Sequence, residues 1–421
     1  MRFLPETPDL RGDAHRIINR ALRDALPDRS VKQALSRLSL PERVTLVAVG
    51  KAAWVMAKAA TDFLGGRVTR GVVITKYDHS QGPLPGLVVF EAGHPVPDDR
   101  SYGATRAAID LVKPLGAGDT VLFLVSGGGS ALFEEPLCSP EELQDVTRQL
   151  LACGADITEI NAIRKRLSAV KGGRFAELCA PARVVSVILS DVLGDRLDAI
   201  ASGPAVPDAC TVDMARRIAA KYRLRLSDSA LALLGRETPK ALDNVENHVI
   251  GSVRQLCASA EEAAAELGYR TQVLTAGLCC TARDAGSFLA SIARHHADTR
   301  ESLAFICGGE TVVQLTGHGL GGRNQELALA AAHGLAGLEG ACVFSVGSDG
   351  TDGPTDAAGG YVDGETLSRL RDRGVSVDAA LADNDAYHAL SASDGLIVTG
   401  ATGTNVNDLS VLLIKRQGEM P

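Results

Sequence analysis

Three consecutive glycines flanked by serines follow an apolar segment in the first third of the chain. They are Ser126, Gly127, Gly128, Gly129 and Ser130, directly after Val121–Val125. Glycines let backbone N–H groups converge on an anion, and a helix opening after them adds a favourable dipole. A plain strand-to-helix turn is the alternative, but it would not require the entropy cost of three glycines. Because GxxxxGK[ST] is absent, this is no Walker A loop. We expect it to bind phosphate or carboxylate.

Two charged residues stand at the ends of other apolar runs. Lys51 follows the run 44–49, and Asp191 follows the run 184–189. Ligands of open α/β sheets bind outside the carboxyl ends of the strands. A solvated helix start for Lys51 and a loop cap for Asp191 are the alternatives. We expect Lys51 to neutralise an anion, and Asp191 to hold Mg²⁺ or orient a hydroxyl group.

Further carboxylates crowd a Gly/Pro-rich segment in the second half. Asp349, Asp352 and Asp356 lie within nine residues, in a spacing that no EF-hand uses. Turn chemistry explains Asp and Gly there without a ligand. Asp349 and Asp352 remain candidate Mg²⁺ ligands beside Asp191.

Residues Gly317–Gly322 match GxGxxG, the pattern of a dinucleotide-binding turn. The next acidic strand end, Asp349, lies further on than the usual ~20 residues. Arg323 and Asn324 open the helix that follows, and a guanidinium suits phosphate or carboxylate better than nicotinamide. We therefore expect Arg323 and Asn324 to contact an anionic substrate, with nicotinamide dinucleotide binding as the weaker alternative.

Apolar residues with helical spacing predict a helix over Ile160–Val170, ended by Gly172-Gly173. Its neighbouring face carries cations from Arg164 to Arg174, among them Lys171, which we expect to bind substrate or phosphate. A solvated amphipathic face is the alternative.

Continuous apolar runs alternate with helical stretches through the first half of the chain. This pattern predicts a doubly wound parallel sheet between helix layers, a Rossmann-like α/β domain. A polar stretch around 234–247 suggests a boundary, giving domains 1–245 and 246–421. The second half predicts a smaller α/β domain, with strands at 303–307 and 311–315 joined in a hairpin at Gly308-Gly309.

Composition narrows the class of function. The 421 residues carry a net charge of −8 and 4% aromatics, which argues against nucleic acid as a partner. No apolar run reaches the roughly 18 residues of a membrane helix, and the N-terminus lacks a signal sequence. Nine cysteines without CxxC spacing indicate free thiols in a reducing compartment. We expect a cytoplasmic protein that does not bind membranes.

Several segments, in order along nearly the whole chain, resemble the glycerate 2-kinase family of bacteria and animals. They are VAVGKAA at 47–53, EAGHPVPD at 91–98, SGGGSA at 126–131, LSAVKGGR at 167–174, SDV at 190–192, ASGP at 201–204, GGET at 308–311, GGRNQE at 321–326 and SDGTDGPTDAAG at 348–359. The C-terminal part of this family is called the MOFRL domain.

The resemblance implies ATP-dependent phosphorylation of D-glycerate to 2-phosphoglycerate, with Mg²⁺. It also implies an active site in the cleft between a Rossmann-like domain and a smaller MOFRL domain. The family's functional lysine and arginine correspond to Lys51 and Arg323. Members are often labelled hydroxypyruvate reductase, so an NAD(P)H-dependent reductase is the rival, and a non-enzymatic sensor of small anions is a third possibility. The oligomeric state, monomer or homodimer, stays open.

Overall fold

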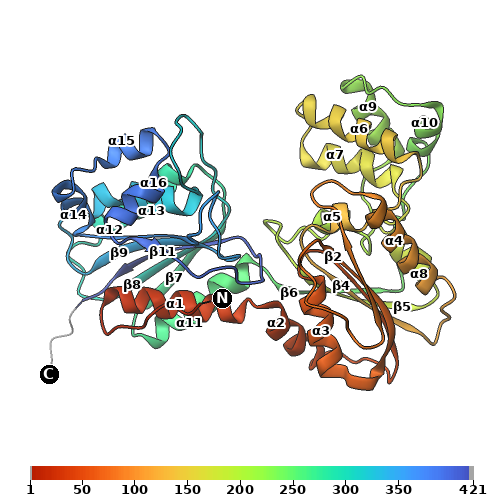
Figure 1. Ribbon diagram of the computed structural model, residues 1–421, viewed down its shortest axis with the longest axis horizontal. Helices are drawn as coiled ribbons and strands as arrows, with labels where there is room; N and C mark the ends of the chain where they lie inside the picture. Colours follow the sequence, from red (N-terminus) through yellow and green to blue (C-terminus); the bar gives the residue numbers. More distant parts are fainter. Residues whose placement is uncertain (1, 417–421) are drawn as a thin grey trace. The chain divides into compact units, whose positions relative to one another are not determined.

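Six strands form the sheet of a central unit, Pro27–Ile250, in the computed structural model, which describes residues 2–416 (Figure 1). The strands are β1 Val44–Val49, β2 Val68–Lys76, β3 Leu87–Ala92, β4 Thr120–Val125, β5 Arg183–Leu189 and β6 Val245–Gly251. Their order is β3-β2-β1-β4-β5-β6, and the pairings from β3 to β5 are parallel. This is the strand order of a Rossmann sheet, so the expected doubly wound fold is confirmed.

Helices cover both faces of this sheet, and its central strands are therefore buried along their whole length. They are α2 Pro27–Leu35, α3 Ala53–Leu64, α4 Asp99–Val112, α5 Gly129–Leu132 and α8 Arg174–Cys179. Three phenylalanine rings, Phe123, Phe133 and Phe175, pack together in the core, with centroids 4.7–5.9 Å apart.

A separate helical cluster with its own apolar core completes the central unit. It consists of α6 Pro140–Ala152, α7 Ile157–Arg164, α9 Val212–Lys221 and α10 Asp228–Leu234. Figure 1 shows these helices beyond the end of the sheet where α5 lies. The two insertions that form the cluster follow β4 and β5, the strands that precede the glycine-rich loop and Asp191.

The predicted helix Ile160–Val170 is wrong in its second half. Helix α7 ends at Arg164, and a 3₁₀ turn over Lys165–Leu167 leads into irregular chain. Leu167 and Val170 are nevertheless buried, Leu167 in the 3₁₀ turn and Val170 in the irregular chain that follows. Lys171 therefore does not lie on a helical cationic face.

The terminal unit combines the first 26 residues with the chain from Gly251 onward. Its strands are β7 Arg270–Leu278, β8 Leu303–Gly309, β9 Ala341–Gly347, β10 Gly359–Asp363, β11 Leu396–Ile397 and β12 Asp408–Ile414. The order is β11-β10-β9-β12-β8-β7, antiparallel except for β7 and β8. The expected hairpin at Gly308-Gly309 is wrong, because β8 pairs with β12 and β7 and residues 311–315 form no strand.

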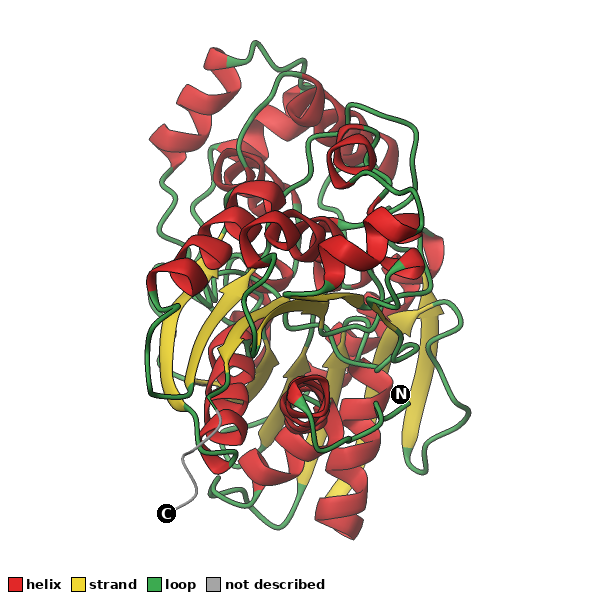
Figure 2. Cartoon of the chain, turned by 90° about the vertical axis from the view of Figure 1, so that its left-hand side faces the viewer, coloured by secondary structure: helices red, strands yellow, loops and turns green. Residues whose placement is uncertain are grey.

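Helices cover both faces of the terminal unit's sheet (Figures 1 and 2). One face carries α1 Leu10–Asp24 and α11 Val253–Glu266; the other carries α12 Ala282–His295, α13 Arg323–Leu335, α14 Thr366–Asp372, α15 Val377–Ala382 and α16 Ala386–Ala392.

The units of the structure differ from the predicted domains, 1–245 and 246–421, mainly at the N-terminal helix α1. This helix belongs to the terminal unit. Its Asp13 is buried and accepts hydrogen bonds from the Tyr269 hydroxyl (2.7 Å) and the Lys415 ammonium (2.6 Å). A buried carboxylate needs such partners, so these contacts fix the helix within the terminal unit.

Candidate active site

The glycine-rich loop and Lys51 follow β4 and β1, the neighbouring strands at which the strand order of the central sheet reverses. The backbone N–H of Lys51 donates to the carbonyl of Gly127 (2.8 Å), and the N–H of Ala52 donates to Ser126 Oγ (3.0 Å). The structure thus brings these predicted site residues together at the switch point, where ligands of such sheets bind.

Space around the glycines explains why larger residues do not fit. Gly128 has φ = +85°, and a Cβ there would lie 3.1 Å from Lys51 Cγ and 3.1 Å from His94 Cδ2. A Cβ on Gly127 would collide with the carboxylate of Asp191. The loop is therefore bracketed by the aliphatic stem of Lys51, the imidazole of His94 and the carboxylate of Asp191, all in the central unit.

His94 is a site residue that sequence reasoning did not single out, although the segment 91–98 carried part of the resemblance. It lies in the connection between β3 and α4 and reaches the loop beside Lys51. Burial, together with the nearby cations Lys51 and Lys76, lowers the pKa of His94. A neutral imidazole at pH 7 can accept a proton or a hydrogen bond next to the loop.

The far end of the loop is held by a strained turn. Ser130 Oγ and Ser202 Oγ are 2.9 Å apart, and Arg164 donates to the Ser130 carbonyl (3.3 Å). Ala201 and Ser202 are buried and adopt positive φ, +50° and +61°. Such strain in residues other than glycine persists only where surrounding contacts enforce it, and it concentrates at functional sites.

Lys171, expected to bind substrate, is instead completely buried. Its ammonium group forms an ion pair with the equally buried Glu134 and donates to the carbonyl of Phe133 (3.3 Å). Burial lowers the pKa of Lys171 to about 8, although Glu134 opposes the shift. Lys171 thus anchors the chain just after α5 and is not exposed to a ligand in this structure.

The three candidate Mg²⁺ ligands are divided between the two units. Asp191 is half-buried at the end of β5, whereas Asp349 and Asp352 belong to the terminal unit. Within residues 2–416, no cluster of three His, Cys, Asp or Glu side chains could hold a metal ion. Proteins usually bind Mg²⁺ through one or two carboxylates plus substrate phosphates, and Asp191 beside Gly127 fits that pattern.

Asp352 is engaged at the start of α13. Its carboxylate accepts from the N–H groups of Asn324 (3.1 Å) and Gln325 (2.8 Å), and it is buried. The Asn324 amide donates to Asp352 (3.2 Å) and accepts from Ser345 (2.5 Å). Asp352, a candidate Mg²⁺ ligand, thus caps the start of α13. Asn324, a candidate substrate contact, is hydrogen-bonded to it within the terminal unit.

Arg323 opens α13 and is held by a carboxylate that the sequence reasoning missed. Its Nε and one terminal nitrogen donate to the two oxygens of Asp408, at 2.5 and 3.0 Å. Glu310 lies 3.5 Å from the other terminal nitrogen. Burial raises the pKa of Asp408 to about 6, although Arg323 opposes the shift. Asp408 and Glu310 fix the orientation of the guanidinium, and one third of the Arg323 side chain remains exposed.

The GxGxxG segment is not arranged as a dinucleotide-binding turn. The N–H of Gly317 donates to the Asn384 side chain (2.9 Å), His318 to Asp383 (2.9 Å) and Leu320 to Asp385 (3.0 Å). A pyrophosphate needs those donors, and Asp352 occupies the first-turn N–H groups of α13. This segment therefore does not form the dinucleotide-binding loop that the reductase alternative requires.

Two protein families match parts of this chain. A family described as a domain of unknown function (DUF4147) matches residues 13–235, and the MOFRL family matches residues 303–408. A D-glycerate 2-kinase from Thermotoga maritima is 52% identical over 98% of this chain and all of its own length.

The chain belongs to the glycerate 2-kinase family.

The crystal structure of a glycerate kinase from Thermotoga maritima superposes with a TM-score of 0.94, covering 96% of this chain and 99% of the other. A relative from Agrobacterium vitis, 39% identical over 88% of this chain and 99% of its own length, is provisionally named a hydroxypyruvate reductase. As expected, all nine cysteines are free thiols in the structure. No helix in the described residues has the length and apolar character to cross a membrane.

Proposed function

We propose that this protein transfers the γ-phosphoryl group of ATP to the 2-hydroxyl group of D-glycerate. The observation that carries the proposal is the grouping of Lys51, Asp191 and His94 around the glycine-rich loop at the switch point of the central sheet. The name of the 52% identical relative supports it.

The reaction forms a bond between the glycerate oxygen and the γ-phosphorus, and breaks the bond from that phosphorus to the β–γ bridging oxygen. ADP leaves with the bridging oxygen, and the hydroxyl proton goes to a base. Phosphoryl transfer depends mainly on positioning and charge stabilisation. Lys51 supplies a cation and the loop supplies backbone donors for the negatively charged oxygens.

Asp191 and His94 are the two groups beside the loop that can handle a proton or a cation. The carboxylate of Asp191 would hold Mg²⁺, which neutralises phosphate charge when bound. The imidazole of His94, neutral because its pKa is lowered, would then accept the hydroxyl proton. Arg323, oriented by Asp408, would pair with the carboxylate of glycerate, since its fork suits that group.

A paired assay tests the proposal. The full chain is incubated with D-glycerate, ATP and Mg²⁺ and ADP release is followed; in parallel, oxidation of NADH or NADPH is followed with hydroxypyruvate. We expect ADP release that depends on glycerate and no comparable oxidation of the nicotinamide cofactor. Robust reductase turnover without ATP would reverse the assignment, and ADP release independent of glycerate would refute the substrate.

A further inference from the structure

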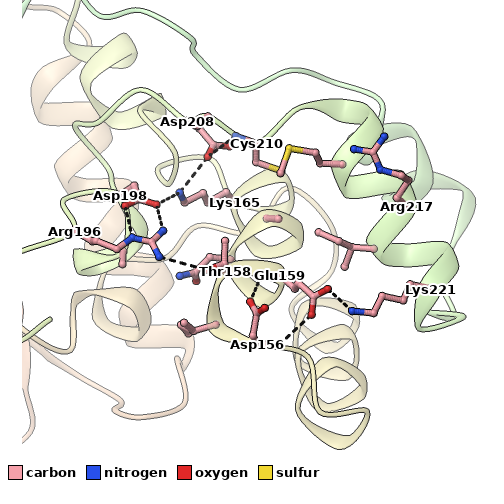
Figure 3. A pocket seen from close by; sticks show the side chains of 17 residues that line it. Asp156, Thr158, Glu159, Lys165, Arg196, Asp198, Asp208, Cys210, Arg217 and Lys221 are labelled. Carbon is pink, nitrogen blue, oxygen red and sulfur yellow. Dashed lines mark hydrogen bonds and ion pairs between the residues drawn. The ribbon is translucent and has the colours of Figure 1, made fainter. Parts of the chain in front are cut away.

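A cavity of about 500 Å³ lies in the helical cluster of the central unit, apart from the residues assigned above (Figure 3). Helices α7 and α9 and the segments 196–199 and 208–210 enclose it. Cavities of 300–1,000 Å³ typically hold ligands much larger than a three-carbon acid. Glycerate alone therefore does not account for a cavity of this size.

Part of the cavity wall is apolar and exposed. Ile157 and Met214 line it with 61% and 39% of their surfaces exposed, beside Ala162, Ala199 and Ile218. Large apolar side chains gain free energy when a ligand removes them from water, at about 25 cal/mol per Å². This wall suits a flat, largely apolar ring.

The charged residues of the cavity neutralise one another. The pairs are Lys165 with Asp208 (3.1 Å), Arg196 with Asp198 (2.9 Å) and Lys221 with Glu159 (2.7 Å). Only Arg217, among the lining cations, has no hydrogen bond or ion pair within residues 2–416, and no dashed line reaches it in Figure 3. A polyphosphate would find little net attraction inside, whereas a guanidinium can stack on an aromatic base.

One turn separates the cavity from the glycine-rich loop. Ala199 lines the cavity, while Ala201 packs on the loop, 2.6 Å from where a Cβ on Gly129 would lie. Ser202 Oγ bonds to Ser130 on the loop side and donates to the lining residue Asn161 (3.4 Å). A ligand that fills the cavity therefore ends close to the loop.

We propose that this cavity binds the purine base and ribose of ATP, with the phosphate chain extending past Ser202 toward the glycine-rich loop. The inference rests on the proposed kinase function and assigns the nucleoside a place within the central unit. An apolar ring with an anionic tail matches an apolar, charge-balanced cavity that opens beside an anion-binding loop.

The test fills the cavity from an exposed position. Ala209 lines the cavity and is exposed, so Ala209→Trp blocks it at little cost to folding; Ala220→Trp, at an exposed site on α9 outside the lining, is the matched control. Calorimetric titration measures ADP and, separately, inorganic tripolyphosphate. We expect Ala209→Trp to weaken ADP binding at least tenfold, raise the KM for ATP, and leave tripolyphosphate binding and the KM for glycerate unchanged.

Each other outcome has a defined meaning. The proposal is overturned if Ala209→Trp binds ADP as tightly as the wild type does. It is also overturned if the affinity for tripolyphosphate falls as much as the affinity for ADP. If Ala209→Trp does not fold, Arg217→Ala replaces it, with severalfold weaker ADP binding expected and no change refuting the cavity. A wild-type protein that binds ADP through this cavity but does not phosphorylate glycerate contradicts the proposed function alone, whereas absence of ADP binding contradicts both.

Discussion

Glycine 128 shows how one missing side chain shapes the candidate site. Its φ is positive, and a Cβ at this position would lie 3.1 Å from Lys51 and from His94. A side chain here would therefore meet both backbone strain and lack of space. Gly154 also has positive φ, +73°, but a Cβ there would have no neighbour within 4 Å. Substituting each glycine therefore separates backbone strain, which both substitutions cause, from steric obstruction, which only the substitution at Gly128 causes.

We expect Gly128→Ala to lower kcat/KM by about 10²-fold or more, because the methyl group displaces Lys51 or His94 from a preorganised electrostatic site. Gly154→Ala should lose only about 1 kcal/mol of stability and keep its activity. Steady-state kinetics and thermal unfolding of both variants provide the comparison. Equal activity in the two variants would show that the loop is only a turn.

The Arg323–Asp408 pair predicts a pH dependence. The pKa of Asp408 is raised to about 6, so protonation below that pH removes the charge that holds the guanidinium. We expect kcat/KM for glycerate to fall as pH drops from 7 to 5. Asp408→Asn should have lower activity throughout and lack the part of this dependence that Asp408 contributes, while sharing the titrations of ATP and of His94. Parallel pH profiles for the two proteins would exclude Asp408 from positioning Arg323.

At the scale of elements, the buried Lys171–Glu134 pair fixes the chain after α5. Removing one partner of a buried ion pair costs about 3–5 kcal/mol, whereas replacing both by apolar residues is often neutral. We expect Lys171→Met to be strongly destabilised, and Lys171→Met/Glu134→Leu to recover most of the loss in denaturant unfolding. Lys58→Met, which breaks an exposed pair with Asp62, should cost less than about 1 kcal/mol.

The same pair gives a pH signature. Because burial lowers the pKa of Lys171 to about 8, the folded protein releases this proton at lower pH than the unfolded chain, whose lysines titrate near 10.4. Between these values the unfolded state binds more protons, so the free energy of unfolding should rise with pH. Lys171→Met should lack this increment, and an identical slope in both proteins would contradict it.

Local sequence patterns predicted the elements that depend on local signals. The continuous apolar runs of β1 and β4 predicted both strands to within one residue, and therefore located Lys51 and the glycine-rich loop at strand ends. The prediction of a helix through Val170 was wrong because irregular chain can bury apolar residues at the same spacing as a helix does. Strand β10, Gly-Gly-Tyr-Val-Asp, has no apolar run to reveal it.

Partners distant in sequence were not predictable from such patterns. Glu134 for Lys171, Asp408 for Arg323 and Asp352 for the start of α13 lie 28 to 85 residues away. Nothing in the sequence near either residue of such a pair marks the other. His94 had a signal, its place in the segment 91–98 that carried the resemblance, but residue type alone gave it no role.

At the scale of the whole molecule, the chain passes from the terminal unit to the central unit and back again, so a single cut does not separate the two units. Helix α1 belongs to the terminal unit, and the central unit is inserted between α1 and α11. An amphipathic helix at the N-terminus could pack on either sheet, so its place follows from tertiary contacts: its packing on α11 and β9 and the hydrogen bonds of Asp13. That Lys51 and Arg323 serve the same reaction, in a cleft between the domains, stays a prediction.

The most direct measurement of the central claim is phosphorus NMR of the full chain incubated with ATP, Mg²⁺ and D-glycerate. The account predicts 2-phosphoglycerate and ADP in equal amounts, and a loss of at least about 10² in kcat for Lys51→Met, with Lys58→Met as an exposed, active control. Formation of 3-phosphoglycerate, free phosphate without a phosphorylated product, or full activity in Lys51→Met would contradict it.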